Sequence, residues 1–202
     1  MENKILLILI IIFTFSSLAL SIPKQAIILT GQSNMGKSAM FIRELMPNHR
    51  IVNCSVGGSS ITEWQKGEYN YEKCLQIVQI LQRDGYKIAG IFFFQGERDS
   101  HSPLIAIRWK WFFYKFVNNF RSDISERKIP IIFAQLGKKA PIQPGTWGIV
   151  QFQQRRSQSS EMNLYMIKTN DIEPYCQELS PHFCPEAYPI IAQRFVDEFR
   201  NH

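Results

Sequence analysis

The stretch Ala26-Ile27-Ile28-Leu29-Thr30-Gly31-Gln32-Ser33-Asn34 decides the fold, because a short apolar run leads directly into a polar turn. Such a run is typical of a strand that is buried on both faces. A glycine-permitted turn then presents Ser33 at the carboxyl end of the sheet, where open α/β folds bind ligands. A serine after a strand more often forms a turn or caps a helix than attacks a substrate, so a catalytic role needs support from the rest of the chain.

Strand and helix patterns alternate along the chain. The predicted strands are Ala26–Leu29, Ile51–Asn53, Ile88–Phe94, Ile129–Gln135 and Leu164–Lys168. Helical patterns lie at Tyr71–Asp84, Pro103–Phe120, Val150–Ser160 and Pro185–Arg200. This alternation predicts a three-layer α/β/α domain with a mostly parallel five-stranded sheet. We interpret Trp64, and the cluster Trp109, Trp111, Phe112 and Phe113, as packing side chains rather than a ligand site.

Residues 1–21 resemble a secretory signal peptide that is cleaved before Ile22. The apolar stretch Ile5–Phe13 is followed by Ser16, Ser17 and small residues that fit a cleavage site. A membrane anchor is the alternative, but the apolar run is short against the roughly 17 to 25 residues that a spanning helix needs. We therefore expect a secreted protein whose single domain covers residues 22–202.

The four cysteines favour disulfides in an oxidising compartment, because no C-x-x-C spacing indicates a metal site. A bridge between Cys176 and Cys184 would brace the loop that carries His182, which leaves Cys54 and Cys74 as a second pair. Buried free thiols are the alternative.

The formal net charge of +6 is spread along the chain, with only Lys138-Lys139 and Arg155-Arg156 adjacent. A nucleic-acid partner is not expected for a secreted chain with such dispersed charge. An anionic polysaccharide or a membrane surface stays open as a partner. Nothing in the sequence requires more than a monomer.

Acyl transfer by a serine needs a hydroxyl, a base, a group that orients the base, and donors for the oxyanion. Ser33 supplies the hydroxyl and His182 the base. The donors would be the backbone N–H of Ser33, a backbone N–H from Gly57-Gly58, and the side-chain amide of Gln95. His49 and His101 have no partner at metal-ligand spacing, so we expect surface residues there, and neither a metal nor another cofactor.

Three blocks in this order resemble the SGNH hydrolases, and most closely their carbohydrate-esterase branch of sialate O-acetylesterase and acetylxylan-esterase-like proteins. The blocks are Gly31-Gln32-Ser33-Asn34-Met35, Gly57-Gly58-Ser59-Ser60-Ile61 with Trp64, and Gln95-Gly96-Glu97 with Asp99, followed by His182-Phe183. The resemblance implies a flavodoxin-like fold and metal-free removal of O-acetyl groups from acetylated carbohydrate. It implies Ser33 as nucleophile, His182 as base, and oxyanion or substrate contacts from Gln32, Gly57, Gly58, Gln95 and Glu97. Of the two block glycines, Gly58 aligns better with the relatives' donor.

The chain departs from the family at the acid, because Leu179 stands where many relatives have an aspartate three residues before the histidine. Glu178 and Asp171 are candidate substitutes, and a backbone carbonyl is a third. The leading hypothesis is a secreted serine esterase, and the alternative is a catalytically weak or silent carbohydrate-binding protein. A lipid-acting esterase of the same superfamily is a third possibility, although no apolar lid is evident.

Overall fold

The computed structural model describes residues 24–138, 145–172 and 182–202. The predicted signal peptide, Cys176 and Glu178 therefore lie outside the described residues. The strands are β1 (Gln25–Gly31), β2 (His49–Asn53), β3 (Lys87–Phe94), β4 (Ile131–Ala134) and β5 (Leu164–Ile167). The α-helices are α1 (Ser33–Leu45), α2 (Tyr69–Arg83), α3 (Pro103–Asp123), α4 (Trp147–Arg155) and α5 (Ala187–Arg200), and two short 3₁₀ helices are η1 (Ile61–Trp64) and η2 (Asp99–His101).

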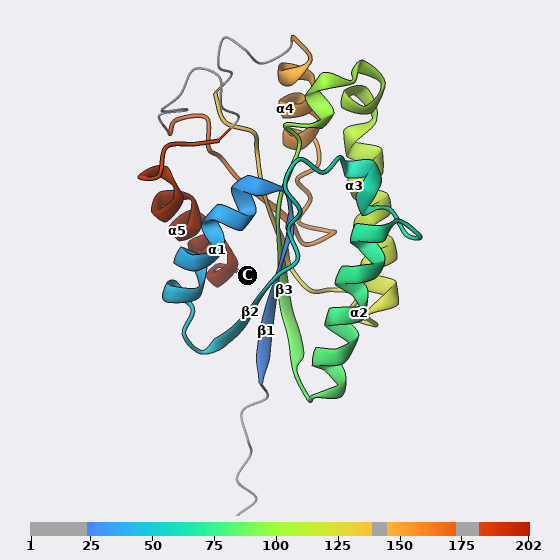
Figure 1. Ribbon diagram of the computed structural model, residues 1–202, viewed down its shortest axis with the longest axis vertical. Coiled ribbons are helices and arrows are strands. Elements are labelled where there is room, and N and C mark those ends of the chain that lie inside the picture. Colours follow the sequence, from blue (N-terminus) through green and yellow to red (C-terminus); the bar gives the residue numbers. More distant parts are fainter. Residues whose placement is uncertain (1–23, 139–144, 173–181) are drawn as a thin grey trace, which may run out of the picture.

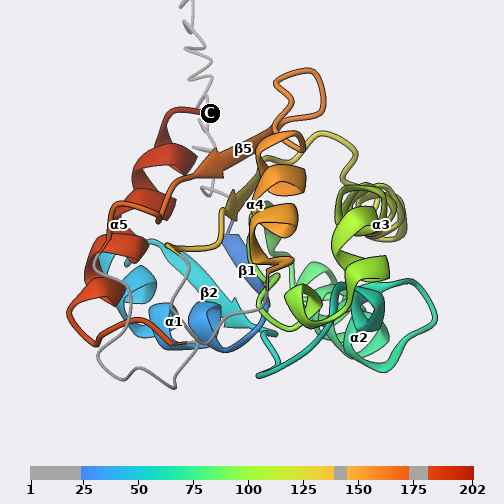
Figure 2. The same ribbon diagram turned by 90° about the horizontal axis from the view of Figure 1, so that it is seen from above.

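The five strands form one sheet in the order β2-β1-β3-β4-β5, and every neighbouring pair is parallel. Helices α1 and α5 cover one face, and α2, α3 and α4 cover the other (Figures 1 and 2). The predicted three-layer α/β architecture is confirmed, and each predicted strand overlaps an observed one. Among the described helices, none is long and apolar enough to cross a bilayer.

The phenylalanine run at the end of β3 explains why the strand patterns are continuous rather than alternating. Phe92 stacks on Phe195 of α5, with ring centroids 5.2 Å apart, on one face of the sheet. Phe93 packs 5.2 Å from Phe113 of α3 on the other face. Because both faces are covered, successive side chains are all buried, and each phenylalanine contributes about 1.5 to 3 kcal/mol by burial.

Two helices differ from the prediction. Helix α1 has no counterpart among the predicted helices, because Asn34, Gly36 and Ser38 weaken its helical propensity. It forms because it packs against α5 and β1 in the folded protein. Helix α4 begins before the predicted Val150 and ends at Arg155, and Ser159 beyond it pairs with Leu164 at the start of β5.

The predicted bridge between Cys54 and Cys74 is absent, since both side chains are free thiols. The two thiols are neighbours that hydrogen bond to each other, and burial of Cys74 raises its thiol pKa well above the ordinary value. A high pKa disfavours the thiolate that disulfide formation requires. The other predicted bridge involves Cys176, which is outside the described residues.

Candidate active site

The turn between β1 and α1 depends on Gly31. Its φ is +108°, a left-handed conformation, and a Cβ at this position would overlap the carbonyl oxygen of Phe94. The backbone N–H of Gln32 donates to the same carbonyl at 2.8 Å. The ends of β1 and β3 are thereby fixed together, and α1 begins at Ser33 on the carboxyl edge of the sheet.

Ser33 lies beside His182 although 149 residues separate them in the chain. The distance from Ser33 Oγ to His182 Nε2 is 2.9 Å. Burial lowers the pKa of His182 below its ordinary value, and the positive charge of Lys37 lowers it further. A lowered pKa keeps the imidazole neutral near pH 7, so its ring nitrogen can accept the serine proton.

Candidate oxyanion donors lie in the first turn of α1 and in the glycine loop. The N–H of Ser33 is in the first turn of α1, where backbone N–H groups have no acceptor within the helix and the helix dipole favours negative charge. A Cβ added to Gly57 would lie 3.9 Å from the Cβ of Ser33, whereas one added to Gly58 would meet nothing within 4 Å. Both glycines line the pocket at Ser33, and the choice between their N–H groups as the second donor stays a prediction.

Gln95 is not placed as an oxyanion donor in this structure, which corrects the sequence-based expectation. Its side chain is completely buried, and Nε2 donates to the carbonyl of Ser59 at 3.1 Å and to Asp99 Oδ2 at 2.7 Å. Its Oε1 accepts from Trp109 Nε1 at 2.9 Å. The amide thus holds the glycine-rich loop onto β3, because neither of its hydrogens is directed at the substrate site.

Glu97 is buried at the base of the site and belongs to a polar network with two residues that sequence reasoning had not selected. Asn34 Nδ2 donates to Glu97 Oε1 at 2.5 Å, and Tyr188 Oη donates to Asn34 Oδ1 at 3.0 Å. Among the described residues, Glu97 Oε2 has no hydrogen-bond partner. Burial raises the pKa of Glu97 from its ordinary value of 4.5 to about 7.

The predicted residues, apart from Gln95 and Glu178, line a single pocket of about 370 Å³, a volume within the usual range for ligand sites. The lining consists of Gln32, Ser33, Gly57, Gly58, Glu97, Arg98, His101, Trp147 and His182. His101 is exposed, as expected, and it also borders the pocket. Arg98 and Trp147 were not selected from the sequence, where no motif distinguishes them. Among the described residues, no cluster of three or more potential metal ligands occurs.

The candidate acid Asp171 is engaged with a different partner. Its two carboxylate oxygens each accept from Arg194 of α5 at 2.7 Å. The hydrogen bonds from Arg194 lower the pKa of Asp171. Since both oxygens serve this ion pair, the structure gives Asp171 a role in fixing α5 rather than in orienting His182. Glu178 lies outside the described residues.

The family model described as carbohydrate esterase, sialic acid-specific acetylesterase, matches residues 36–201. The match begins three residues after Ser33, so the assignment of the serine rests on its geometry and on the first sequence block. A probable carbohydrate esterase of Arabidopsis thaliana is 28% identical over 82 residues, which cover 41% of this chain and 32% of that relative. The aligned segment thus spans about a third of the relative's length.

Solved structures agree on the fold. The Arabidopsis thaliana protein superposes with a TM-score of 0.78 and 18% identity, covering 89% of this chain and 99% of the other. A carbohydrate acetylesterase from Xanthomonas citri superposes with a TM-score of 0.66 and 15% identity, covering 87% of this chain and 56% of the other. A member of the lipolytic G-D-S-L family from Veillonella parvula superposes with a TM-score of 0.60 and 13% identity, covering 88% of this chain and 100% of the other. At these identities the likeness demonstrates the SGNH hydrolase fold alone.

Proposed function

The chain belongs to the carbohydrate esterase family of sialic acid-specific acetylesterases, and from that premise we propose that it is a serine esterase that removes O-acetyl groups from carbohydrate. The observation that carries the proposal is the 2.9 Å approach of Ser33 Oγ to His182 Nε2. A serine becomes a useful nucleophile when a neutral base lies within hydrogen-bond distance of its hydroxyl. The lowered pKa of His182 favours that neutral base.

In this reaction His182 takes the hydroxyl proton as Ser33 Oγ attacks the acetyl carbonyl carbon. The negative charge that develops on the carbonyl oxygen is stabilised by the N–H of Ser33 at the start of α1 and by an N–H of the Gly57-Gly58 loop. The C–O bond to the sugar then breaks, and His182 returns the proton to the leaving sugar oxygen. Water attacks the acetyl-enzyme by the same route and releases acetate.

Hydrolysis of p-nitrophenyl acetate, acetylated xylan and O-acetylated sialic acid tests this proposal directly. We expect Ser33→Ala to reduce kcat by roughly a thousandfold or more, as removal of a nucleophile does in serine hydrolases. Ser160→Ala is the matched control, because Ser160 is exposed and is not one of the residues that line the pocket. Equal activity in the wild type and the Ser33→Ala variant would refute the assignment of the nucleophile.

A carbohydrate-binding protein without catalysis is the second candidate. The observation that favours it is that Asp171, one of the candidate acids, pairs with Arg194. In a serine protease, loss of the carboxylate that orients the catalytic histidine can cost about ten-thousandfold in rate. A serine-directed organophosphonate distinguishes the two functions, because rapid labelling at Ser33 requires an activated hydroxyl. Failure to label Ser33, together with retained binding of acetylated sugar, would favour the binding protein.

We also propose that the protein is secreted, because residues 1–21 resemble a signal peptide. N-terminal sequencing of the protein recovered from the medium of producing cells should begin at Ile22. Retention of the intact N-terminus on a membrane fraction would favour the anchor instead.

A further inference from the structure

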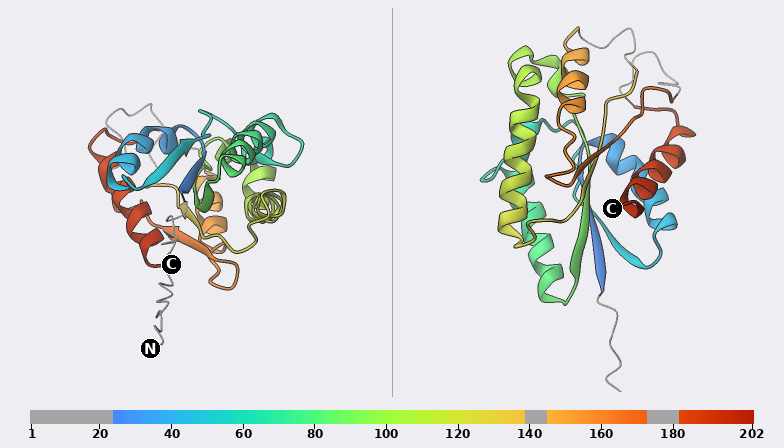
Figure 3. Two further views of the ribbon diagram at one scale, coloured as in Figure 1. Left: turned by 90° about the horizontal axis from the view of Figure 1, so that it is seen from below. Right: turned by 180° about the vertical axis from the view of Figure 1, so that it is seen from behind.

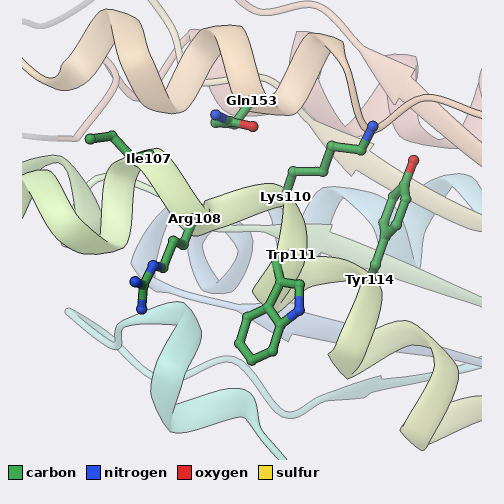
Figure 4. Close-up of a pocket in the computed structure, with 6 residues that line it drawn as sticks. All are labelled: Ile107, Arg108, Lys110, Trp111, Tyr114 and Gln153. Atoms are coloured by element: carbon green, nitrogen blue, oxygen red, sulfur yellow. The ribbon is translucent and has the colours of Figure 1, made fainter.

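A second and larger pocket lies on the outer surface of α3 and α4, away from the serine. Its volume is about 670 Å³, and it shares no lining residue with the pocket at Ser33. Figure 4 shows its six lining side chains, five from α3 and one from α4: Ile107, Arg108, Lys110, Trp111, Tyr114 and Gln153.

Trp111 is not explained by helix packing, contrary to the sequence-based interpretation of this aromatic cluster. Trp109 and Phe113 are completely buried, as predicted, but Trp111 is 57% exposed. Ile107, one turn earlier on α3, is 56% exposed. Large apolar side chains that gather at an exposed hollow are typical of a binding site.

Two of the six lining residues, Arg108 and Lys110, are cationic, and Lys115 lies close by. Lys110 Nζ lies 5.0 Å from the ring centroid of Tyr114, and Lys115 Nζ lies 5.2 Å from that of Trp111. No Asp or Glu occurs between Ser102 and Ser122, or in the segment 145–160. Among the described residues, neither Arg108 nor Lys110 forms an ion pair. The charge of this surface is therefore complementary to an anionic ligand.

We propose that this pocket binds an acidic saccharide. The half-exposed Trp111 ring offers a flat apolar group for a sugar ring, and the amide of Gln153 can hydrogen bond to hydroxyl groups. Arg108 and Lys110 supply cations for sugar carboxylates. The Tyr114 hydroxyl donates to the carbonyl of Ser157 at 3.4 Å, which holds this side of the pocket in place.

The position of the pocket connects it with the site at Ser33. Helix α3, which lies beside α4 in Figure 3, begins at Pro103, two residues after His101 in the serine pocket, and carries five of the six residues that line the second pocket. Ile107 to Tyr114 lie roughly 6 to 17 Å along the helix axis from Pro103. One polysaccharide chain can reach both pockets, and its attachment at α3 would raise the effective concentration of acetyl groups at Ser33. This last step rests on the proposed function, whereas saccharide binding does not.

Calorimetric titration of the full protein with oligogalacturonate, an acidic saccharide, and with neutral xylo-oligosaccharide tests the proposal. We expect binding of the oligogalacturonate that weakens with salt and becomes about tenfold or more weaker in Trp111→Ala and in Lys110→Gln. Tyr69→Ala is the matched control, because Tyr69 on α2 is 74% exposed and has Lys73 Nζ 5.6 Å from its ring centroid. Hydrolysis of p-nitrophenyl acetate should be unchanged in all three variants, since none alters the serine pocket.

Unchanged oligogalacturonate affinity in Trp111→Ala, or an equal loss in Tyr69→Ala, would overturn the proposal. Equally tight binding of the neutral saccharide would overturn its acidic character. If phosphatidylserine vesicles bound through Trp111 while oligogalacturonate did not bind, the surface would be a membrane site instead. Binding at α3 without any ester hydrolysis would refute the proposed function and would still support saccharide binding at the second pocket.

Discussion

Replacing Glu97 by glutamine should flatten the pH dependence of the protein's stability. Burial raises the pKa of Glu97 from 4.5 to about 7, so the folded protein holds a proton that the unfolded chain has already released. Stability from this group is therefore complete below about pH 4.5 and is lost as pH rises through about 7. Glutamine keeps the hydrogen bond from Asn34 and cannot ionise, so the variant should lack this loss.

The size of the effect follows from the two pKa values. Between about pH 5 and about pH 8, a group that shifts from 4.5 to about 7 lowers the free energy of unfolding by about 2.5 kcal/mol. A folded-state pKa one unit lower would give about 1 kcal/mol. For a protein of this size, the difference corresponds to a Tm change of roughly 2 to 10 °C. Burial also raises the pKa of Asp99, to about 6. Asp99 therefore adds a similar pH dependence of stability, which the wild type and Glu97→Gln share.

Urea unfolding at about pH 5 and about pH 8 measures the effect in the wild type and in Glu97→Gln. The loss of stability between the two pH values should be smaller in Glu97→Gln by about 1 to 3 kcal/mol. The matched control is Glu68→Gln, which removes an exposed carboxylate at the N-cap of α2 and should preserve the wild-type pH dependence of stability. Identical slopes in the wild type and Glu97→Gln would refute the conclusion that Glu97 is protonated in the folded protein.

The remaining predictions concern the base and the turn. Lys37→Gln removes a positive charge that lowers the pKa of His182, so the acidic limb of the pH profile of kcat/KM for p-nitrophenyl acetate should move to higher pH. An unchanged acidic limb would show that the charge of Lys37 does not affect the pKa of His182. Gly31→Ala places a Cβ against the carbonyl of Phe94 at a φ of +108°, and we expect a loss of about 3 kcal/mol or more in thermal or urea unfolding. A loss below about 1 kcal/mol would mean that the turn relaxes easily.

The sequence determined the layers of the fold and most of the site. Continuous apolar runs such as Ile88–Phe94 predict buried strands from the sequence alone, because a strand covered on both faces has no solvent-facing side that requires polar residues. Polar residues after β1 and the glycine block predict a site at one edge of the sheet, because parallel strands end together there. His182 and Ser33 were paired from their residue types and motifs, and the structure brings them within 2.9 Å.

Only the tertiary structure decided which way individual side chains face. Gln95 and Glu97 are two residues apart, yet the amide of Gln95 is held below the pocket by Trp109 while Glu97 borders it. Trp109 and Trp111 look alike in the sequence, but one is buried and the other is exposed. These differences arise from contacts between segments far apart in the chain, which local propensity and spacing do not encode.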